Sequence, residues 1–200
     1  VRERFGLPLS QRIGIGIDRL DYTKGVIERL HAVARLLEIE PRWIGRFTFI
    51  QIAAPTRGMI GEYRDYATKV SQLADAINAR YKDAPFPPII LLAEHHEPEA
   101  VYEYHRAADL CFVSSLHDGM NLVAKEFVAA QDEARPAVLV LSRFAGAACE
   151  LADAVLTNPF HPDGMAKDLD RALTMPLAER AERHGRLLAA VRRTTASSWA

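Results

Sequence analysis

Short runs of apolar residues recur along the chain, separated by longer stretches in which apolar residues return every three or four positions. The short runs occupy residues 13–17, 47–52, 89–92, 110–113, 138–141 and 154–156. These runs are continuously apolar rather than alternating, which is typical of strands covered on both faces of a sheet. We therefore expect buried strands that pair in parallel.

The intervening stretches have the period of amphipathic helices. The clearest apolar face is carried by Ile60, Tyr63, Ala67, Val70, Ala74, Ile77 and Tyr81. Further helices are predicted over residues 26–37, 98–108 and 119–131. Pro176 suits the first position of a last helix, because a helix does not use the N–H that proline lacks there.

Strands that alternate with helices require crossover connections, which are right-handed in a parallel sheet. We predict one doubly wound, Rossmann-like α/β domain over residues 1–200, with no internal linker. Ligands of such sheets bind outside the carboxyl ends of the strands. The loops that follow the strands are therefore the candidate sites.

The composition is that of a globular protein. Of the 200 residues, 49% are hydrophobic and 26% charged, which argues against disorder, a collagen-like chain or a disulfide-stapled mini-protein. Lys and Arg total 25 and Asp and Glu 26, a net charge of -1. A nucleic-acid-binding protein usually has an excess of basic residues, and the overall composition shows none, although a local basic patch is compatible with these totals. No apolar run approaches the ~20 residues of a membrane helix, so we expect no membrane partner.

The two cysteines lie far apart in the sequence. Cys111 and Cys149 each have apolar neighbours, so we expect two buried, reduced thiols. With no export signal visible, the expected location is cytoplasmic. The chain does not begin with Met, and we expect it to be a piece of a longer protein.

The loop at residues 18–25 follows the first predicted strand and leads into a helix. Arg19 and Lys24 stand beside the helix N-terminus, whose free N–H groups favour an anion such as a diphosphate. An equally acceptable interpretation is a surface loop whose charges pair among themselves, since Asp18 and Asp21 are adjacent.

Two further loops carry charged or imidazole side chains. Arg57, after the second strand, could bind a phosphate or carboxylate with its planar fork, or could be solvated. His95 and His96 stand between two glutamates. Neighbouring side chains diverge, so a shared metal ion is disfavoured and a loop lining a pocket is the better interpretation.

The loop after the fourth strand contains a turn signal, Asp118-Gly119, before the next helix. Asp118 and Asn121 could hydrogen-bond a sugar beside the helix N-terminus, and Glu126 could face either that ligand or solvent. A capped helix with solvated charges fits the same residues. The small residues at 142–148 permit close packing or close ligand approach, of which packing is the safer expectation.

Three strings are carried by these loops: DRLDYTKG at 18–25, DGMNLVAKE at 118–126 and LSRFAGAA at 141–148. They resemble the trehalose-6-phosphate synthase family of retaining glycosyltransferases. The resemblance extends from about residue 12 to residue 199 and concerns the family's C-terminal, donor-binding domain. It implies one half of a two-domain GT-B enzyme whose active site lies in the interdomain cleft, with the N-terminal acceptor domain absent from this chain.

The resemblance also implies the reaction. Glucose would pass from UDP-glucose to glucose 6-phosphate with retention, giving trehalose 6-phosphate, without a metal or other cofactor. A related synthase could instead use another phosphorylated acceptor such as glycerol 3-phosphate. A third alternative is a nucleotide-sugar-binding module without catalysis, and we expect the isolated chain to be inactive because the acceptor has no site without the second domain.

The family's functional residues map onto matching positions of this chain. The resemblance assigns donor binding to Arg19, Lys24, His96, Asp118, Gly119, Met120, Asn121, Leu122, Val123, Ala124, Lys125 and Glu126. Arg19 and Lys24 would hold the diphosphate and supply the main catalytic stabilisation as UDP leaves, and Arg57 would reach the acceptor phosphate. Asp118 would meet the donor glucose hydroxyls, with Glu126 at the ribose and His96 near the uracil. His96 stands where the family often has phenylalanine, and His117 where arginine is common.

This interpretation requires a specific arrangement in space. The side chains of Arg19 and Lys24 should converge with the acidic turn at residue 118, almost a hundred positions later in the sequence.

Overall fold

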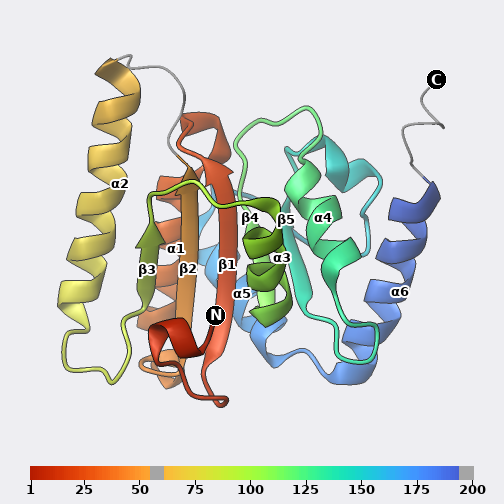
Figure 1. Ribbon diagram of the computed structural model, residues 1–200, viewed down its shortest axis with the longest axis horizontal. Coiled ribbons are helices and arrows are strands. Elements are labelled where there is room, and N and C mark those ends of the chain that lie inside the picture. Colours follow the sequence, from red (N-terminus) through yellow and green to blue (C-terminus); the bar gives the residue numbers. More distant parts are fainter. Residues whose placement is uncertain (55–60, 194–200) are drawn as a thin grey trace.

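The computed structural model describes residues 1–54 and 61–193, which form one open sheet with helices on both faces (Figure 1). The strands are β1 (Arg12–Arg19), β2 (Phe47–Ala54), β3 (Ile89–Leu92), β4 (Leu110–Val113), β5 (Val138–Ser142) and β6 (Val155–Thr157). They are ordered β3-β2-β1-β4-β5-β6, and every pair is parallel. The predicted doubly wound α/β fold is therefore confirmed.

The helices are divided between the two faces of the sheet (Figure 1). One face is covered by α1 (Val26–Ile39), α2 (Gly61–Arg80) and α5 (Pro162–Thr174). The other is covered by α3 (Pro98–Ala107), α4 (Leu122–Ala130) and α6 (Leu177–Arg193). Short 3-10 helices lie at Glu3–Phe5, Tyr22–Lys24, Pro41–Trp43 and Gly146–Cys149.

Burial on both faces explains why the strands are continuously apolar. Successive side chains of a strand point to opposite faces. Phe47 and Phe49 of β2 pack in the core beneath α1 and α2, whereas Ile50 and Ile52 pack in the core beneath α3 and α4. Each strand must therefore supply apolar residues to two cores.

Two glycines in β1 make room for larger groups on the α1 side. A Cβ atom at Gly14 would lie 2.7 Å from a ring carbon of Phe49. A Cβ atom at Gly16 would overlap the Arg29 guanidinium of α1 and approach the Gln51 amide of β2. The glycines thus let aromatic rings and one arginine approach the central strand closely.

One cysteine and one helix differ from the sequence-based expectations. Cys149 is exposed, because it ends the short helix Gly146–Cys149 instead of entering a core; only Cys111, within β4, is buried. Burial raises the pKa of the Cys111 thiol to about 12. Helix α5 was not predicted, although Met165, Leu169 and Leu173 recur at helical spacing and are buried.

The last helix begins at Leu177, one position after the expected Pro176. Among the described residues, no helix is long and apolar enough to span a membrane.

A buried histidine lies between two helices of the α3–α4 face. His105 is fully buried, its ring packs against Phe127 with centroids 5.6 Å apart, and neither ring nitrogen has a hydrogen-bond partner. Burial lowers the pKa of His105 to about 4, because the imidazolium would lose its hydration.

We expect acid to destabilise the chain through His105. Between the ordinary pKa of 6.5 and the folded value of about 4, the unfolded state binds a proton that the folded state excludes, so stability falls as pH falls. By linkage, the loss reaches roughly 3 kcal/mol below the folded pKa. His105→Leu should flatten the decline in urea-unfolding free energy between about pH 7 and about pH 4.5. The control is His31→Gln, at an exposed histidine of α1; equal pH dependence in wild type and His105→Leu would contradict the assignment.

Candidate active site

The site lies where the strand order reverses, at the carboxyl ends of β1 and β4. These strands are neighbours at the centre of the sheet, but their following helices, α1 and α4, lie on opposite faces. Such a switch point opens a crevice between the two loops. The loops at 20–25 and 114–121 therefore meet there.

The loop after β1 is held in shape by local contacts. The Asp21 side chain accepts hydrogen bonds from the backbone and hydroxyl of Thr23, at 2.9 and 2.8 Å. Gly25 has φ 63°, and a Cβ atom there would overlap the carbonyl oxygen of Ser114. The Thr23 carbonyl in turn accepts from the backbone N–H of Leu116 at 2.8 Å. These contacts fix the two loops against one another.

The loop after β4 is organised by Asn121. This residue has φ 78° and caps α4, its Oδ1 accepting from the Ala124 N–H at 3.0 Å. Its Nδ2 donates to Oδ2 of Asp118 at 3.1 Å. One side chain thus starts the helix and orients the carboxylate.

The loop after β5 forms backbone hydrogen bonds to the Asp118 turn. The Gly146 N–H donates to the Asp118 carbonyl at 2.9 Å, and the Ala147 N–H donates to the Met120 carbonyl at 2.7 Å. A Cβ atom at Gly146 would overlap the carbonyl oxygen of Gly119. The small residues of this loop therefore serve close packing, as expected.

Lys24 and Asp118 meet across the crevice. The Lys24 ammonium lies 2.7 Å from Oδ2 of Asp118, and their side chains are 18% and 13% exposed. Burial works to raise the pKa of Asp118, but hydrogen bonds from Lys24 and Asn121 outweigh it and hold that pKa below its ordinary value. From the described residues, Oδ1 receives only a long contact, 3.5 Å, from the Met120 N–H. One carboxylate oxygen is thus engaged by the protein, while the other is nearly unoccupied.

Beneath this pair lies a buried ion pair that the sequence analysis did not identify. Arg29 of α1 is 0% exposed, and its Nη1 lies 2.7 Å from Oδ2 of Asp18. The guanidinium also donates to Gln51 and Ser114, both at 2.9 Å, and to the Lys24 carbonyl at 3.4 Å. Burial raises the pKa of Asp18, and Arg29 opposes that shift.

The other predicted cations are placed differently. Arg19 is the last residue of β1, at the same edge as Lys24; its side chain is exposed and forms no ion pair within the described part of the chain. The structure therefore brings Lys24 into contact with the acidic turn, but not Arg19. Arg57 lies outside the described residues.

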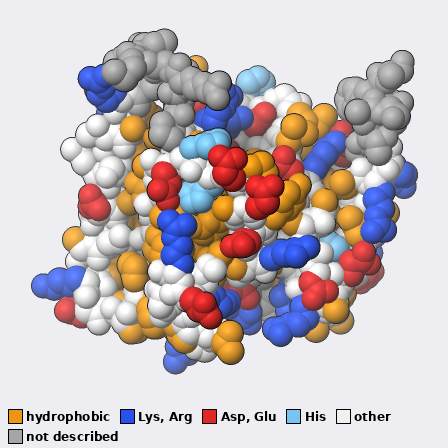
Figure 2. Space-filling model, viewed as in Figure 1, with side chains coloured by type: hydrophobic (Ala, Val, Ile, Leu, Met, Phe, Trp, Pro, Cys, Tyr) orange, Lys and Arg blue, Asp and Glu red, His pale blue; other side chains and the backbone are white. Residues whose placement is uncertain are grey.

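A hollow of about 400 Å³ opens beside the crevice, between the loop after β3 and helices α3 and α4. It is lined by His95, His96, Glu97, Pro98, Val101, Tyr102 and Glu126. Acidic and histidine side chains gather on this face of the molecule (Figure 2). His96 and Glu126, which come from different elements, thus share one concave surface.

His96 is fixed by its neighbours. Its ring packs edge-on against Tyr104, with centroids 5.4 Å apart, and its Nδ1 lies 3.3 Å from the Glu94 carbonyl. Arg4 contacts both partners, at 2.9 Å from the Tyr104 hydroxyl and 3.0 Å from the Glu94 carboxylate.

The first turn of α4 has mixed exposure. Leu122 is 63% exposed and Val123 half-buried, whereas the Ala124 side chain is buried and its N–H is engaged by Asn121. Lys125 pairs with Glu150 at 2.7 Å. Glu126 is exposed at the hollow. Within residues 1–54 and 61–193, no group of three or more His, Cys, Asp or Glu is arranged to hold a metal ion.

The fold and strand order define a Rossmann-like α/β domain with a charged crevice at its switch point. The model of glycosyltransferase family 20 matches residues 1–200, and the chain belongs to that family.

Named relatives agree with this assignment. The trehalose-6-phosphate synthase of Enterobacter sp. (strain 638) is 45% identical over 183 residues, which is 92% of this chain and 39% of the relative. A solved trehalose-phosphate synthase (UDP-forming) from Burkholderia vietnamiensis superposes with a TM-score of 0.94 at 43% identity, over 99% of this chain and 44% of that one. The chain thus spans about two-fifths of the length of these relatives.

Two further solved structures contain ligands. The Burkholderia xenovorans synthase in complex with glucose-6-phosphate is 44% identical, with a TM-score of 0.93 over 95% of this chain and 42% of that one. An Escherichia coli structure bound with UDP-2-fluoro glucose is 42% identical, with the same TM-score and the same coverage of both chains.

We expect the buried pair beneath the crevice to be strongly coupled. Asp18→Asn leaves the Arg29 charge buried without its counterion, which typically costs about 3–5 kcal/mol. Asp18→Asn combined with Arg29→Met should cost less than the sum of the two single changes. Urea unfolding of the four species measures this coupling.

The matched control is the pair between Arg35 of α1 and Asp163, which is exposed although its atoms lie only 2.6 Å apart. Asp163→Asn should cost less than about 1 kcal/mol. If Asp18→Asn is no more damaging than Asp163→Asn, Arg29 does not depend on Asp18.

Proposed function

We propose that this chain is the donor-binding domain of a trehalose-phosphate synthase. In the complete enzyme, glucose passes from UDP-glucose to glucose 6-phosphate with retention of configuration. The observation that carries the proposal is the contact of Lys24 with Asp118 at the switch point of the sheet. Membership of glycosyltransferase family 20, and relatives solved with glucose-6-phosphate and UDP-2-fluoro glucose, support the choice of substrates.

The donor diphosphate is assigned to the cationic side of the crevice. An ammonium group has three donors, so Lys24 can keep its bond to Asp118 and still bind a phosphate oxygen. Arg19, exposed at the same edge, offers a planar fork for bidentate binding. Negative charge develops on the diphosphate as the bond to the sugar breaks, and fixed cations at that position lower the barrier.

The donor sugar is assigned to the turn on the other side. Within the described part of the chain, Oδ1 of Asp118 receives only the long contact from Met120, so it can accept a hydrogen bond from a sugar hydroxyl. Asn121 and Lys24 fix the orientation of that carboxylate through Oδ2. A pre-oriented acceptor binds a hydroxyl without first losing conformational freedom.

The nucleoside is assigned to the hollow beside α3. Among the described residues its lining includes Glu97 and Glu126 and no Lys or Arg, so these side chains disfavour phosphate but suit neutral groups rich in hydroxyl and amide donors. Glu126 is placed to accept from the ribose hydroxyls. His96, which lines the same hollow, is assigned to the base, as the resemblance implies.

The acceptor is assigned to a domain outside this chain. We infer that Arg57 contributes toward the acceptor phosphate, as the resemblance implies. A related enzyme that uses glycerol 3-phosphate would have the same donor half, so the acceptor is decided mainly by the second domain. By itself this chain is expected to bind the donor without turning it over.

Nucleotide binding by the chain is the first test. Calorimetric titration with UDP, UDP-glucose, GDP-glucose and ADP-glucose should show a preference for the uridine nucleotides. Lys24→Ala and Arg19→Ala should each weaken UDP binding by about 10- to 100-fold, the equivalent of lost charge-assisted hydrogen bonds. Lys82→Ala, an exposed lysine after α2, is the control and should bind like wild type.

The same titrations separate the two halves of the donor. Glu126→Ala should weaken UDP but leave pyrophosphate binding unchanged, because pyrophosphate has no ribose. Lys24→Ala should weaken both. Wild-type UDP affinity in the Lys24 and Arg19 variants would remove the basis for the proposed site.

Turnover is the second test. The chain mixed with UDP-glucose and glucose 6-phosphate should release no UDP, because its crevice is open to water and nothing holds the acceptor. A complete family member assayed in parallel should release UDP. UDP release by the isolated chain would contradict the proposal that turnover requires a second, acceptor-binding domain.

A further inference from the structure

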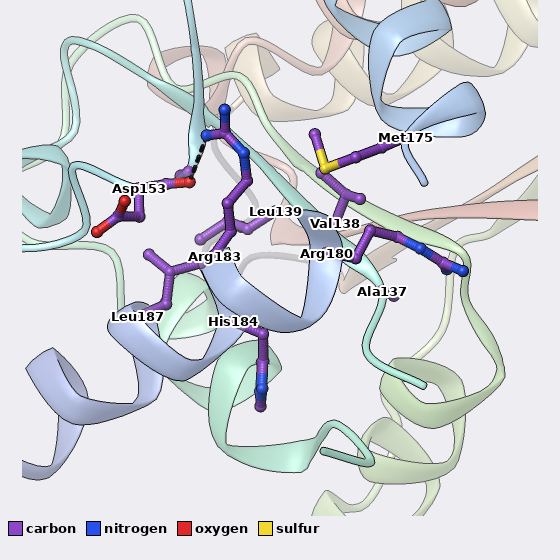
Figure 3. A pocket seen from close by; sticks show the side chains of 10 residues that line it. Ala137, Val138, Leu139, Asp153, Met175, Arg180, Arg183, His184 and Leu187 are labelled. Carbon is purple, nitrogen blue, oxygen red and sulfur yellow. Dashed lines mark hydrogen bonds between the residues drawn. The ribbon is translucent and has the colours of Figure 1, made fainter. Parts of the chain in front are cut away.

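The hollow beside α3 is large enough for a nucleoside. Its volume of about 400 Å³ lies within the range of small-molecule sites, about 300–1,000 Å³. The cavity between β5 and α6, at which Arg183 donates to the Asp153 carbonyl at 3.0 Å (Figure 3), is much smaller. Its volume is about 10 Å³, about what one water centre needs. Of these two cavities only the hollow can admit a nucleoside, so the contacts that shape its wall bear on ligand binding.

One wall of the hollow is a loop. Residues 93–97 connect the end of β3 to the start of α3, and His95, His96 and Glu97 line the hollow from this loop. Loops are more mobile than the elements that they connect. Side-chain contacts with neighbouring elements therefore decide where this wall stands.

His96 is held by two residues that do not line the hollow, Tyr104 of α3 and Glu94. Its side chain is 6% exposed, and its ring packs edge-on against the Tyr104 ring, with centroids 5.4 Å apart. Its Nδ1 lies 3.3 Å from the Glu94 carbonyl oxygen, and its Nε2 lies 3.5 Å from Oε1 of the same residue. The position of the imidazole thus depends on the positions of Tyr104 and Glu94.

Arg4 joins these two residues to one another. It lies in the segment ahead of β1, 100 positions from Tyr104 and 90 from Glu94 in the sequence. Its Nη1 donates to the Tyr104 hydroxyl at 2.9 Å, and its Nη2 donates to Oε1 of Glu94 at 3.0 Å. A guanidinium presents its donors in a rigid, planar fork. One side chain therefore sets the distance between α3 and the loop that carries His96.

We propose that Arg4 is a positioning residue for the nucleoside site. Through Tyr104 and Glu94 it holds His96 in the position that receives the base of UDP. Arg4 does not line the hollow, so it acts without touching the ligand. This inference rests on the proposed function, which assigns the nucleoside to the hollow and the diphosphate to Lys24.

The test compares the binding of UDP and pyrophosphate by the chain and its Arg4→Ala variant. UDP binding should weaken by about 3- to 10-fold, on the scale of one or two lost hydrogen bonds. Pyrophosphate binding should not change, because pyrophosphate has no nucleoside. The Arg4 and Glu94 side chains are 52% and 55% exposed, and such exposed pairs add little to stability. The variant should therefore unfold at nearly the same urea concentration as wild type.

The matched control is Arg80→Ala. Arg80 of α2 is also 52% exposed and also pairs with a carboxylate, that of Glu38. This variant removes the same charge from a different face of the sheet, and it should bind both ligands like wild type.

Two further variants identify the contacts that carry the effect. Arg4→Lys keeps the charge but not the fork, so its UDP affinity should fall between those of wild type and Arg4→Ala. Tyr104→Phe removes the hydroxyl and keeps the ring that packs against His96. Combined with Arg4→Ala, it should weaken UDP binding by less than the product of the two single effects, because both changes remove the same hydrogen bond.

The imidazole signals of His96 in NMR spectra give a readout that needs no ligand. His96→Gln identifies these signals by their disappearance. Arg4→Ala should shift them, because the ring current of Tyr104 acts on them with a strength that depends on the distance between the rings. Arg80→Ala should leave them unchanged.

The outcomes distinguish this inference from the proposed function. Unchanged His96 signals in Arg4→Ala, or wild-type UDP affinity in that variant, would overturn the positioning role alone. Equal weakening of UDP and pyrophosphate would also overturn it, because the cause would then be a general loss of positive charge. Failure of the wild-type chain to bind UDP would contradict the proposed function, and with it this role of Arg4.

Discussion

The ion pair between Arg29 and Asp18 is the constraint on which the centre of the molecule depends. A buried charge is tolerated when it is paired and hydrogen-bonded; Arg29 pairs with Asp18 of β1 and donates hydrogen bonds to Gln51 of β2 and Ser114 after β4. These contacts connect α1 to β1, to β2 and to the loop after β4. Gly16 has no side chain because the guanidinium occupies that space.

The buried Arg29 and the partly exposed Lys24 differ in what they can contact. Arg29 is inaccessible to a ligand, since it is 0% exposed. It does donate to the Lys24 carbonyl, and Ser114 accepts from Arg29 while donating to the Gly25 carbonyl at 2.8 Å. The buried charge thus holds the loop that carries Lys24, whose ammonium and its partner Asp118 are partly exposed in the crevice.

The fold was predictable because its signal is local. Each strand is recognisable in the sequence as an apolar run. Ligands of such sheets bind at the carboxyl ends of the strands, so the loops after the strands indicate where the crevice lies. The contact of Lys24 with the Asp118 turn followed from that logic. Helix α5 was missed although Met165, Leu169 and Leu173 carry its period, and Cys149 was placed in a core because apolar neighbours in sequence do not ensure neighbours in space.

The buried position of Arg29 could not be predicted in the same way, because its contacts involve residues that are distant in the sequence. An arginine among the apolar residues of an amphipathic helix is ordinarily a long side chain that reaches solvent. Only its spacing, three residues after buried Val26 and next to buried Leu30, places it on the inner face, and its partners come from three separate segments of the chain.

A whole-chain charge sum fails for a related reason. The net charge of -1 averages over a face that gathers acidic groups near Glu97 and Glu126 and a sheet end that gathers arginines near Asp109. Dissolved salt limits the range of the interaction between exposed charges to about 10 Å. A ligand therefore interacts with the charged groups near it and not with the net charge of the chain. Near-neutrality therefore excludes a uniformly basic surface but is compatible with regions of opposite charge on one small domain.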